Sequence, residues 1–277
     1  MRRSRASKKV LKIGIIGCGT IGSLLAEACE KDLNKEVKLV ALYDMDTSKE
    51  KALRNKLKMT TAPTPLRDVI KKSDFIIEAA SAEVSARIAD MAISAGKDVM
   101  VMSVGGLLKR QGLIEKAKRN GCKIYLPSGA ICGLDGVKAA RIGNIRSVTI
   151  TTRKPPEGLR GAPYIKEKRI DLKSIKKETV IFEGSAAQAV KAFPKNINVS
   201  ATLSLAGVGD KKTRVKIIVS PQHKKNIHEI ELKGNFGRIY TRCENVPSVA
   251  NPKTSMLAAL SAVATLRGIT EAVRIGT

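Results

Sequence analysis

The chain has 277 residues, 43% hydrophobic and 27% charged, which is typical of a soluble globular protein with one large domain or two modest ones. Its 51 lysines and arginines against 25 aspartates and glutamates give a formal net charge of +26 at pH 7. No segment approaches the roughly 18 uninterrupted apolar residues of a transmembrane helix, so the sequence argues against a helical membrane protein.

The positive charge raises the question of a nucleic-acid partner. The basic residues are spread along the whole chain, however, without a basic helix that carries interleaved aromatic residues and without zinc-finger spacing. We therefore expect a solvated basic surface that binds polyanions weakly at low salt, with no specific nucleic-acid partner.

Five cysteines and two histidines bear on metals and redox state. No two cysteines form a C-x-x-C pair, so we expect no metal site. An odd number of cysteines in a chain without a secretory signal predicts reduced thiols and a cytoplasmic protein. The basic residues 1–8 are expected to form a disordered tail rather than a targeting segment.

In the first half of the chain, short apolar strands alternate with helical patterns, as in βαβ units. Strands are expected at residues 12–16, 37–43, 74–79, 98–102 and 123–126, and helices at 21–30, 48–57, 82–95 and 108–119. Strands that are apolar throughout are typical of a parallel sheet covered on both faces. The sequence therefore predicts an α/β fold with a Rossmann domain over residues 9–130.

The second half has a different pattern. Residues 148–152, 213–219 and 226–232 alternate polar and apolar side chains, which predicts an antiparallel sheet with one covered face. Further helices are expected at 186–192, 198–207 and 255–267. We predict an α+β domain over residues 131–251 that binds substrate and dimerises through its free sheet face. The C-terminal segment, residues 252–277, is expected to pack its helix back on the Rossmann domain.

A glycine-rich turn follows the first predicted strand and opens the first predicted helix. It reads G-C-G-T-I-G, the G-x-G-x-x-G fingerprint of a dinucleotide site in its proper context. Gly17 allows a tight turn, Gly19 lets the backbone approach a diphosphate, and Gly22 allows close packing of helix on strand. Thr20 and Ile21 complete the helix N-terminus, whose free N–H groups face the phosphates.

Other candidate cofactor residues follow the next three predicted strands. Asp44 ends the second strand, where a carboxylate accepts hydrogen bonds from the adenosine ribose hydroxyls. Its charge favours NAD, but nearby lysines and arginines leave NADP open. Ala80 and Ser81 follow the third strand and Ser103 follows the fourth, where small residues let a nicotinamide ribose come close or simply form turns.

Seven segments, in order over nearly the whole chain, resemble the L-aspartate dehydrogenase family of archaea and bacteria. They are I-G-I-I-G-C-G-T-I-G (13–22), E-A-A-S (78–81), D-V-M-V-M-S-V-G (98–105), S-G-A-I-C-G-L-D (128–135), F-P-K-N-I-N-V-S-A-T-L-S-L-A-G (193–207), N-I-H-E-I (226–230) and E-N-V-P-S-V-A-N-P-K-T-S (244–255). The last three are far more specific than the glycine fingerprint. The resemblance is weakest over residues 141–179 and does not include the N-terminal tail.

The resemblance implies oxidation of L-aspartate at Cα with NAD or NADP, giving iminoaspartate or, after hydrolysis, oxaloacetate and ammonia. It also implies a role in NAD biosynthesis and a homodimer. Carried over by position, it implies His228 as the active-site histidine and Ala130 and Asn196 as residues that contact the cofactor. An amide such as that of Asn196 can hold a nicotinamide carboxamide through two hydrogen bonds.

A base that titrates near neutrality suits both removal of the amine proton and activation of water. The chain offers His223, in a polar turn where we expect it to be solvated, and His228, in an alternating strand. A strand histidine is more often structural, but the match of its motif to the family favours catalysis. We hypothesise that His228 activates water or the amine. The substrate's carboxylates are expected to meet Asn198, Lys253 and Thr254, although Lys253 suits a solvated turn equally well.

Two other functions compete with this prediction. A related reductase, such as a dihydrodipicolinate reductase or a homoserine dehydrogenase, would share the architecture. The N-I-H-E-I segment and residues 244–255 argue against both. A non-catalytic regulator that binds a dinucleotide, and through its charge a nucleic acid, is the alternative from another class.

Overall fold

The computed structural model describes residues 10–110, 112–194, 197–248 and 251–276, so the tail predicted for residues 1–8 lies outside the described residues. The chain forms two compact units. Unit 1 takes in the described residues up to Ser103, then Arg110–Leu126 and Val263–Ala272. Unit 2 takes in Val104–Lys109, Pro127–Ala262 and the described end of the chain from Val273. Nowhere in the described chain is a helix long and apolar enough to cross a membrane.

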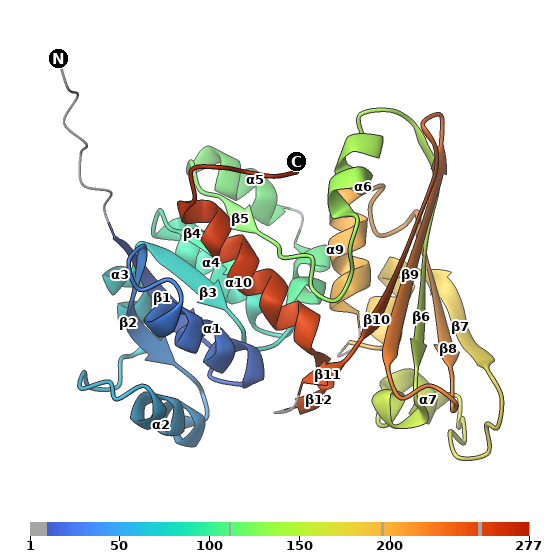
Figure 1. Ribbon diagram of the computed structural model, residues 1–277, viewed down its shortest axis with the longest axis horizontal. Coiled ribbons are helices and arrows are strands. Elements are labelled where there is room, and N and C mark those ends of the chain that lie inside the picture. The colour runs from blue at the N-terminus through green and yellow to red at the C-terminus, as the bar shows by residue number, and fades with distance from the viewer. Residues whose placement is uncertain (1–9, 111, 195–196, 249–250, 277) are drawn as a thin grey trace. The chain divides into compact units, whose positions relative to one another are not determined.

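Unit 1 is built on a five-stranded sheet in the order β2-β1-β3-β4-β5, in which all neighbours are parallel. The strands are β1 (Leu11–Ile16), β2 (Val37–Tyr43), β3 (Phe75–Glu78), β4 (Asp98–Val101) and β5 (Ile124–Tyr125). The helices of this unit are α1 (Thr20–Lys31), α2 (Thr47–Lys56), α3 (Leu66–Lys72), α4 (Ser85–Ser94) and α5 (Gly112–Arg119), as Figure 1 shows. The predicted parallel Rossmann architecture is confirmed.

The carboxyl ends of four strands are aligned by their register. Ile16 lies opposite Tyr43 on one side and Glu78 on the other, and Glu78 lies opposite Val101. The chain runs from β1 to β2 on one side and later returns to β3 on the other. This is the kind of switch point where open α/β sheets bind ligands.

Two details of the first half of the chain differ from the prediction. Helix α3 was not expected, because its seven residues are too few for a clear helical period; it buries Val69 and Ile70. The helix predicted over residues 108–119 is divided into a 3-10 helix, η1 (Val104–Lys109), and α5. Leu107 and Leu108 of η1 are buried, so this segment is held by packing.

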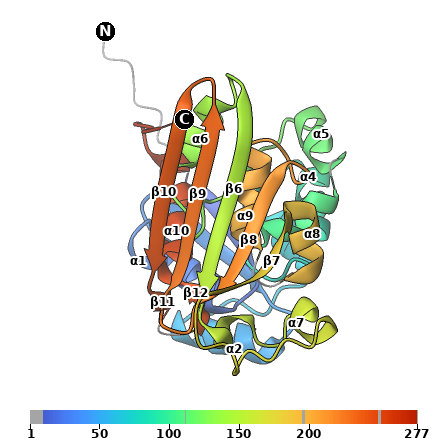
Figure 2. The same cartoon turned by 90° about the vertical axis from the view of Figure 1, so that its right-hand side faces the viewer.

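Unit 2 is built on a second five-stranded sheet in the order β10-β9-β6-β8-β7, shown face-on in Figure 2. The strands are β6 (Ile145–Lys154), β7 (Thr179–Ser185), β8 (Thr213–Val219), β9 (Asn226–Gly234) and β10 (Gly237–Asn245). The prediction of a purely antiparallel sheet is wrong, because β6 and β8 are parallel. The chain between them forms β7 and several helices and so makes a crossover, as a parallel pair requires.

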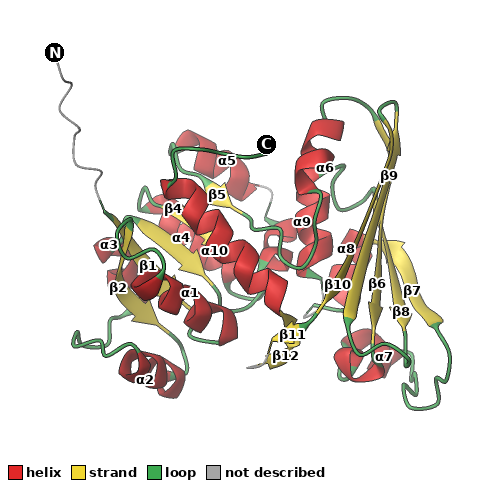
Figure 3. Cartoon of the chain, in the orientation of Figure 1, coloured by secondary structure: helices red, strands yellow, loops and turns green. Residues whose placement is uncertain are grey.

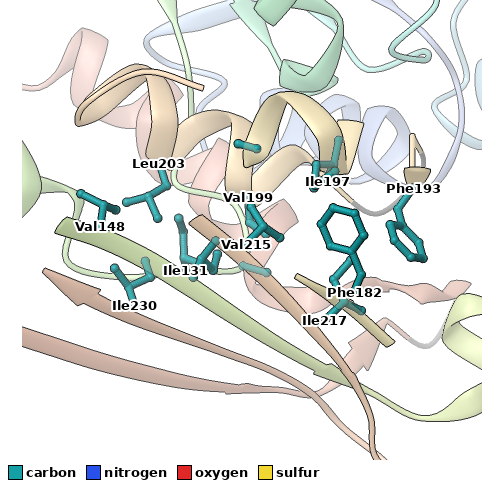
Figure 4. Packing of buried hydrophobic residues seen from close by; sticks show 14 of the residues in the cluster. Ile131, Val148, Phe182, Phe193, Ile197, Val199, Leu203, Val215, Ile217 and Ile230 are labelled. Carbon is teal, nitrogen blue, oxygen red and sulfur yellow. The ribbon is translucent and has the colours of Figure 1, made fainter. Parts of the chain in front are cut away.

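Helices α8 (Ala186–Ala192) and α9 (Asn198–Ala206) were predicted and are confirmed. With α6 (Leu134–Ala140) they belong to the core of unit 2, which is drawn in Figure 4. Leu203 of α9, Val148 of β6 and Ile230 of β9 are all completely or almost completely buried there. This packing covers one face of the sheet and leaves polar side chains on the other.

The remaining elements complete the chain, and Figure 3 labels all of them except η2. They are η2 (Pro156–Leu159), α7 (Pro163–Glu167), β11 (Pro247–Ser248), β12 (Asn251–Ser255) and the C-terminal α10 (Met256–Thr270). The first half of α10 belongs to unit 2 and its second half, from Val263, to unit 1. The edge strands β7 and β10 were not predicted, because an edge strand with exposed or charged side chains lacks a clear apolar alternation.

Candidate active site

Gly17 is required by the backbone around it. Its φ is +106°, a conformation that other residues rarely adopt, and its N–H donates to the carbonyl of Tyr43 at 2.8 Å. An added Cβ would lie 2.4 Å from the carbonyl carbon of Ala79 and 2.6 Å from the backbone nitrogen of Ala80. The turn after β1 is therefore packed directly against the turn after β3.

The other two glycines of the fingerprint have different surroundings. An added Cβ at Gly22 would lie 1.8 Å from the carbonyl oxygen of Gly17, so this glycine lets α1 pack on the turn. An added Cβ at Gly19, the residue that precedes α1, would meet nothing within 4 Å. Open space at Gly19, beside half-buried Thr20 and Ile21 at the N-terminus of a 12-residue helix, fits a diphosphate.

Asp44, the residue after β2, is bonded to the glycine turn. Its Oδ2 accepts a hydrogen bond from the backbone N–H of Cys18 at 2.7 Å, and its Oδ1 accepts one from Asp46 at 2.8 Å. A carboxylate has about four acceptor positions, so these bonds leave lone pairs for ribose hydroxyls. The carboxylate thus fixes the turn and remains suited to the predicted ribose contact.

Glu78, the last residue of β3, was missed by sequence reasoning. It is completely buried, and its carboxyl group accepts hydrogen bonds from Ala80 N–H at 2.8 Å and Ser103 N–H at 3.0 Å. The carbonyl of Ser103 in turn accepts from the hydroxyl of Ser85 at 2.9 Å. Burial raises the pKa of Glu78 to about 7.

The predicted small residues Ala80, Ser81 and Ser103 are therefore positioned by a buried acid. Ala80 is exposed, Ser81 is half-buried, and Ser103 is buried. All three follow strands whose ends are in register with the end of β1. Unit 1 thus brings its predicted cofactor residues, from Gly17 to Ser103, to one edge of one sheet.

His228 lies on the helix-covered face of the second sheet and is only 4% exposed. Its Nδ1 lies 2.9 Å from Oγ1 of Thr152, its cross-strand neighbour on β6. Burial and, secondarily, the charge of Lys154 lower the pKa of His228 to about 3. A titration near neutrality was expected; instead the imidazole is neutral at neutral pH.

Lys154 is a second functional candidate that the sequence did not reveal. It ends β6, two residues after Thr152 and on the same face, and is 6% exposed. Burial lowers the pKa of its ammonium group to about 8. A buried lysine beside a buried histidine is unusual for a structural core and typical of a functional site.

The remaining residues predicted for the site belong to unit 2, and the structure describes the side chains of only some of them. The carbonyl of Ala130 accepts a hydrogen bond from Asn245 Nδ2 at 3.0 Å, and Asn198, at the start of α9, accepts one from Gly105 N–H at 3.1 Å. Thr254 is half-buried on β12. Asn196 and the side chain of Lys253 lie outside the described residues.

Two other titratable side chains, those of His223 and Cys18, have surroundings that the structure describes. His223 lies in a turn, half-buried, with Nε2 3.6 Å from a carboxylate oxygen of Glu178. The thiol of Cys18, inside the glycine turn, has its pKa raised by burial to about 12 and is no nucleophile at neutral pH. Within the described ranges no group of three or more His, Cys, Asp or Glu side chains is arranged to hold a metal ion.

Comparison with known proteins settles the family. The profile described as "Aspartate dehydrogenase, C-terminal" matches residues 135–269, and that described as "Homoserine dehydrogenase, NAD binding domain" matches residues 17–127. The L-aspartate dehydrogenase of Methanosarcina barkeri is 49% identical over 97% of this chain and 100% of its own length. The chain belongs to the L-aspartate dehydrogenase family.

More distant relatives agree with this assignment. The L-aspartate dehydrogenase of Bradyrhizobium diazoefficiens is 39% identical over 96% of this chain and 94% of its own length. The crystal structure of aspartate dehydrogenase from Thermotoga maritima matches with a TM-score of 0.72 and 26% identity, covering 97% of this chain and 100% of that one. The chain is an NAD(P)-dependent oxidoreductase. The profile over residues 135–269 separates it from the rival reductases.

Proposed function

We propose that this chain oxidises L-aspartate at Cα with NAD or NADP, yielding iminoaspartate, which water converts to oxaloacetate and ammonia. Its relatives are named for this activity. The observation that carries the proposal is the buried pair of His228 and Thr152, which places a neutral imidazole on the covered face of the second sheet. Release of iminoaspartate would supply NAD biosynthesis.

The nicotinamide cofactor, when bound, accepts the hydride from Cα. The residues that would hold it are the glycine turn and α1 for the diphosphate and Asp44 for the adenosine ribose. Ala80, Ser81, Ser103, Ala130 and Asn196 are the candidates for the nicotinamide end. The open space at Gly19 supports this assignment, since a side chain there would occupy the approach to the backbone.

His228 acts on protons in this scheme. Hydride departure from Cα requires the amine lone pair, so the substrate ammonium must first lose a proton, and a neutral imidazole accepts it. In the tautomer whose Nδ1–H donates to Thr152, Nε2 carries the free lone pair. An anionic substrate offsets the positive charge of Lys154, the smaller of the two causes that lower the pKa of His228, and so raises the affinity of the imidazole for the proton. Once it has released that proton to solvent, the same imidazole accepts a proton from the water that attacks the imine carbon.

A substitution at His228 tests this role, with His223→Ala as the matched control in a polar turn. His228→Ala is expected to lower kcat for L-aspartate by about 10²–10⁴-fold, the range of general base catalysis, with cofactor affinity unchanged. Absorbance of the reduced cofactor measures turnover across a panel of amino acids. Near-normal turnover by a folded His228→Ala protein, or the same loss in His223→Ala, would contradict the assignment.

The homodimer and the cytoplasmic location belong to this proposal as well. The uncovered face of the second sheet carries Thr149, Thr151 and Tyr240, the last 52% exposed, and is the surface we assign to the dimer. Light scattering during gel filtration is expected to give twice the 29.8 kDa mass of the chain. A monomer mass at micromolar concentration would remove the dimer from the proposal and leave the catalytic assignment standing.

A further inference from the structure

A pocket of about 380 Å³ opens in unit 2 at the end of β6, within the size range of small-ligand sites. The residues of its lining that matter here are Lys154, Glu157, Gly158, Arg160, Lys224 and Asn226. They come from the end of β6, from η2, from the turn before β9 and from the start of β9. None of the residues predicted to bind the substrate is among them.

The charges of this pocket suit an anion. Three of these six residues are cationic and one carries a carboxylate, Glu157, which is exposed and lies 3.6 Å from Arg160. Lys154 forms the buried base, whereas Arg160 and Lys224 are exposed at the rim. Gly158 lies over the stem of Lys154, since an added Cβ would be 3.5 Å from both Cβ and Cδ of the lysine. Gly158 thus packs on the apolar stem of Lys154, and the lysine is one of the residues that line the pocket.

The pocket adjoins the candidate catalytic histidine along the sheet. Thr152 faces His228 across β6 and β9, and Arg153 faces Ile227. Side chains alternate between faces, so the next pair on the face of His228 is Lys154 and Asn226. Two residues of a strand span about 7 Å, so the lysine lies one step along the sheet from the imidazole. In keeping with this closeness, the charge of Lys154 contributes, after burial, to the lowered pKa of His228.

We propose that Lys154, with Arg160 and Lys224 at the rim, binds the side-chain carboxylate of the substrate and so selects a dicarboxylic amino acid. This inference rests on the proposed oxidation of L-aspartate. With the amine at His228, the carboxylate farther from the reacting carbon is the one that reaches a group one step along the sheet. The rim cations attract the anion, and the buried lysine binds it where the low dielectric strengthens the pair.

Lys154→Met tests the proposal, because it keeps an apolar stem at a buried position and removes the charge. The matched control is Lys216→Met on β8, a half-buried lysine on the opposite face of the sheet. We expect Lys154→Met to raise KM for L-aspartate about 30-fold, the effect of one charge-assisted hydrogen bond, with kcat and the KM for NAD changed far less. The rate with L-asparagine, which lacks that carboxylate, should match wild type. An unchanged KM for L-aspartate, or equal losses with both amino acids, would overturn the inference.

Succinate gives a readout that does not depend on turnover. Calorimetric titration is expected to show succinate binding to the wild type and to Lys216→Met, and about 30-fold weaker binding to Lys154→Met. If the wild type binds succinate in this lysine-dependent way but does not oxidise L-aspartate, the proposed function fails and the anion site stands. If the wild type oxidises L-aspartate but Lys154→Met binds succinate as tightly as the wild type does, the anion site fails and the proposed function stands. Should Lys154→Met fail to fold, Lys154→Gln and the rim variant Arg160→Gln carry the same comparison.

Discussion

At the scale of single residues, Glu78 combines two properties that are seldom found together. It is completely buried, and both of its oxygens accept hydrogen bonds from the turns that follow β3 and β4. Those bonds favour the ionised carboxylate, but burial outweighs them and raises its pKa. The positions of Ala80 and Ser103 therefore depend on an acid that titrates near neutrality.

This titration predicts a pH dependence of stability. The pKa of Glu78 rises from an ordinary 4.5 to about 7 on folding, so the folded state binds the proton more tightly. Its stabilising contribution is full below pH 4.5 and is lost as the pH rises through 7, a change of about 3 kcal/mol. Glu78→Gln mimics the protonated acid, so its free energy of unfolding relative to wild type should increase by that amount between pH 4.5 and 8. Urea denaturation measures this difference, and a difference that stays flat or falls would refute the prediction.

The sequence revealed some site residues and concealed others for a physical reason. Gly17, Asp44 and His228 stand in local patterns whose spacing reflects the backbone or the strand that carries them. Glu78 and Lys154 gain their importance from burial among residues distant in the chain, which no local pattern reports. Glu78 is the first residue of the E-A-A-S segment, and Lys154 lies in the R-K-P-P that follows V-T-I-T-T. Neither residue stood out in the sequence, because an acid or a lysine at a strand end is ordinarily solvated.

At the scale of elements, two glycines of the turn from β1 into α1 are needed for different reasons, Gly17 for stability and Gly19 for cofactor binding. Gly17→Ala would place a Cβ against the backbone of Ala79 at a positive φ and is expected to cost more than about 3 kcal/mol of stability. Gly19→Ala meets no protein atom, so its stability should stay within about 1 kcal/mol of wild type while NADH affinity falls at least about tenfold. Thermal unfolding and NADH fluorescence titration test the pair. Loss of folding in Gly19→Ala, or full cofactor affinity, would contradict it.

Strands in the middle of a sheet are easier to predict from the sequence than strands at its edge. Strand β8 lies between two neighbours, its first five residues alternate between buried and less buried positions, and its predicted range matches the structure. Strand β10 lies at the sheet edge with Arg238, Thr241 and Arg242 among its residues, so its pattern resembles a loop. The pairing direction of β6 and β8 depends on how the chain returns, which a strand's own pattern does not encode.

At the scale of the molecule, the excess of positive charge has a measurable consequence. With a formal charge of +26, the folded chain carries more like-charge repulsion than its ion pairs remove. Screening shortens the Debye length from roughly 30 Å at 0.01 M salt to about 8 Å at 0.15 M. The melting temperature is therefore expected to rise by several degrees over this range, and retention on a polyanion resin should vanish. Sodium chloride and choline chloride should act alike, and a melting temperature that falls with both salts would argue against net repulsion.

The division of the chain into units also bears on the order in which it is synthesised. Unit 1 includes the first described strand and also Val263–Ala272, which follows the last strand of its sheet by more than a hundred residues. A ribosome therefore releases the entire five-stranded sheet of unit 1 long before the segment that completes the unit emerges. A truncation at Leu126, although it retains every strand of that sheet, leaves unit 1 unfinished. We therefore expect unit 1 to be completed only after Val263–Ala272 has been translated, well after the last strand of its sheet.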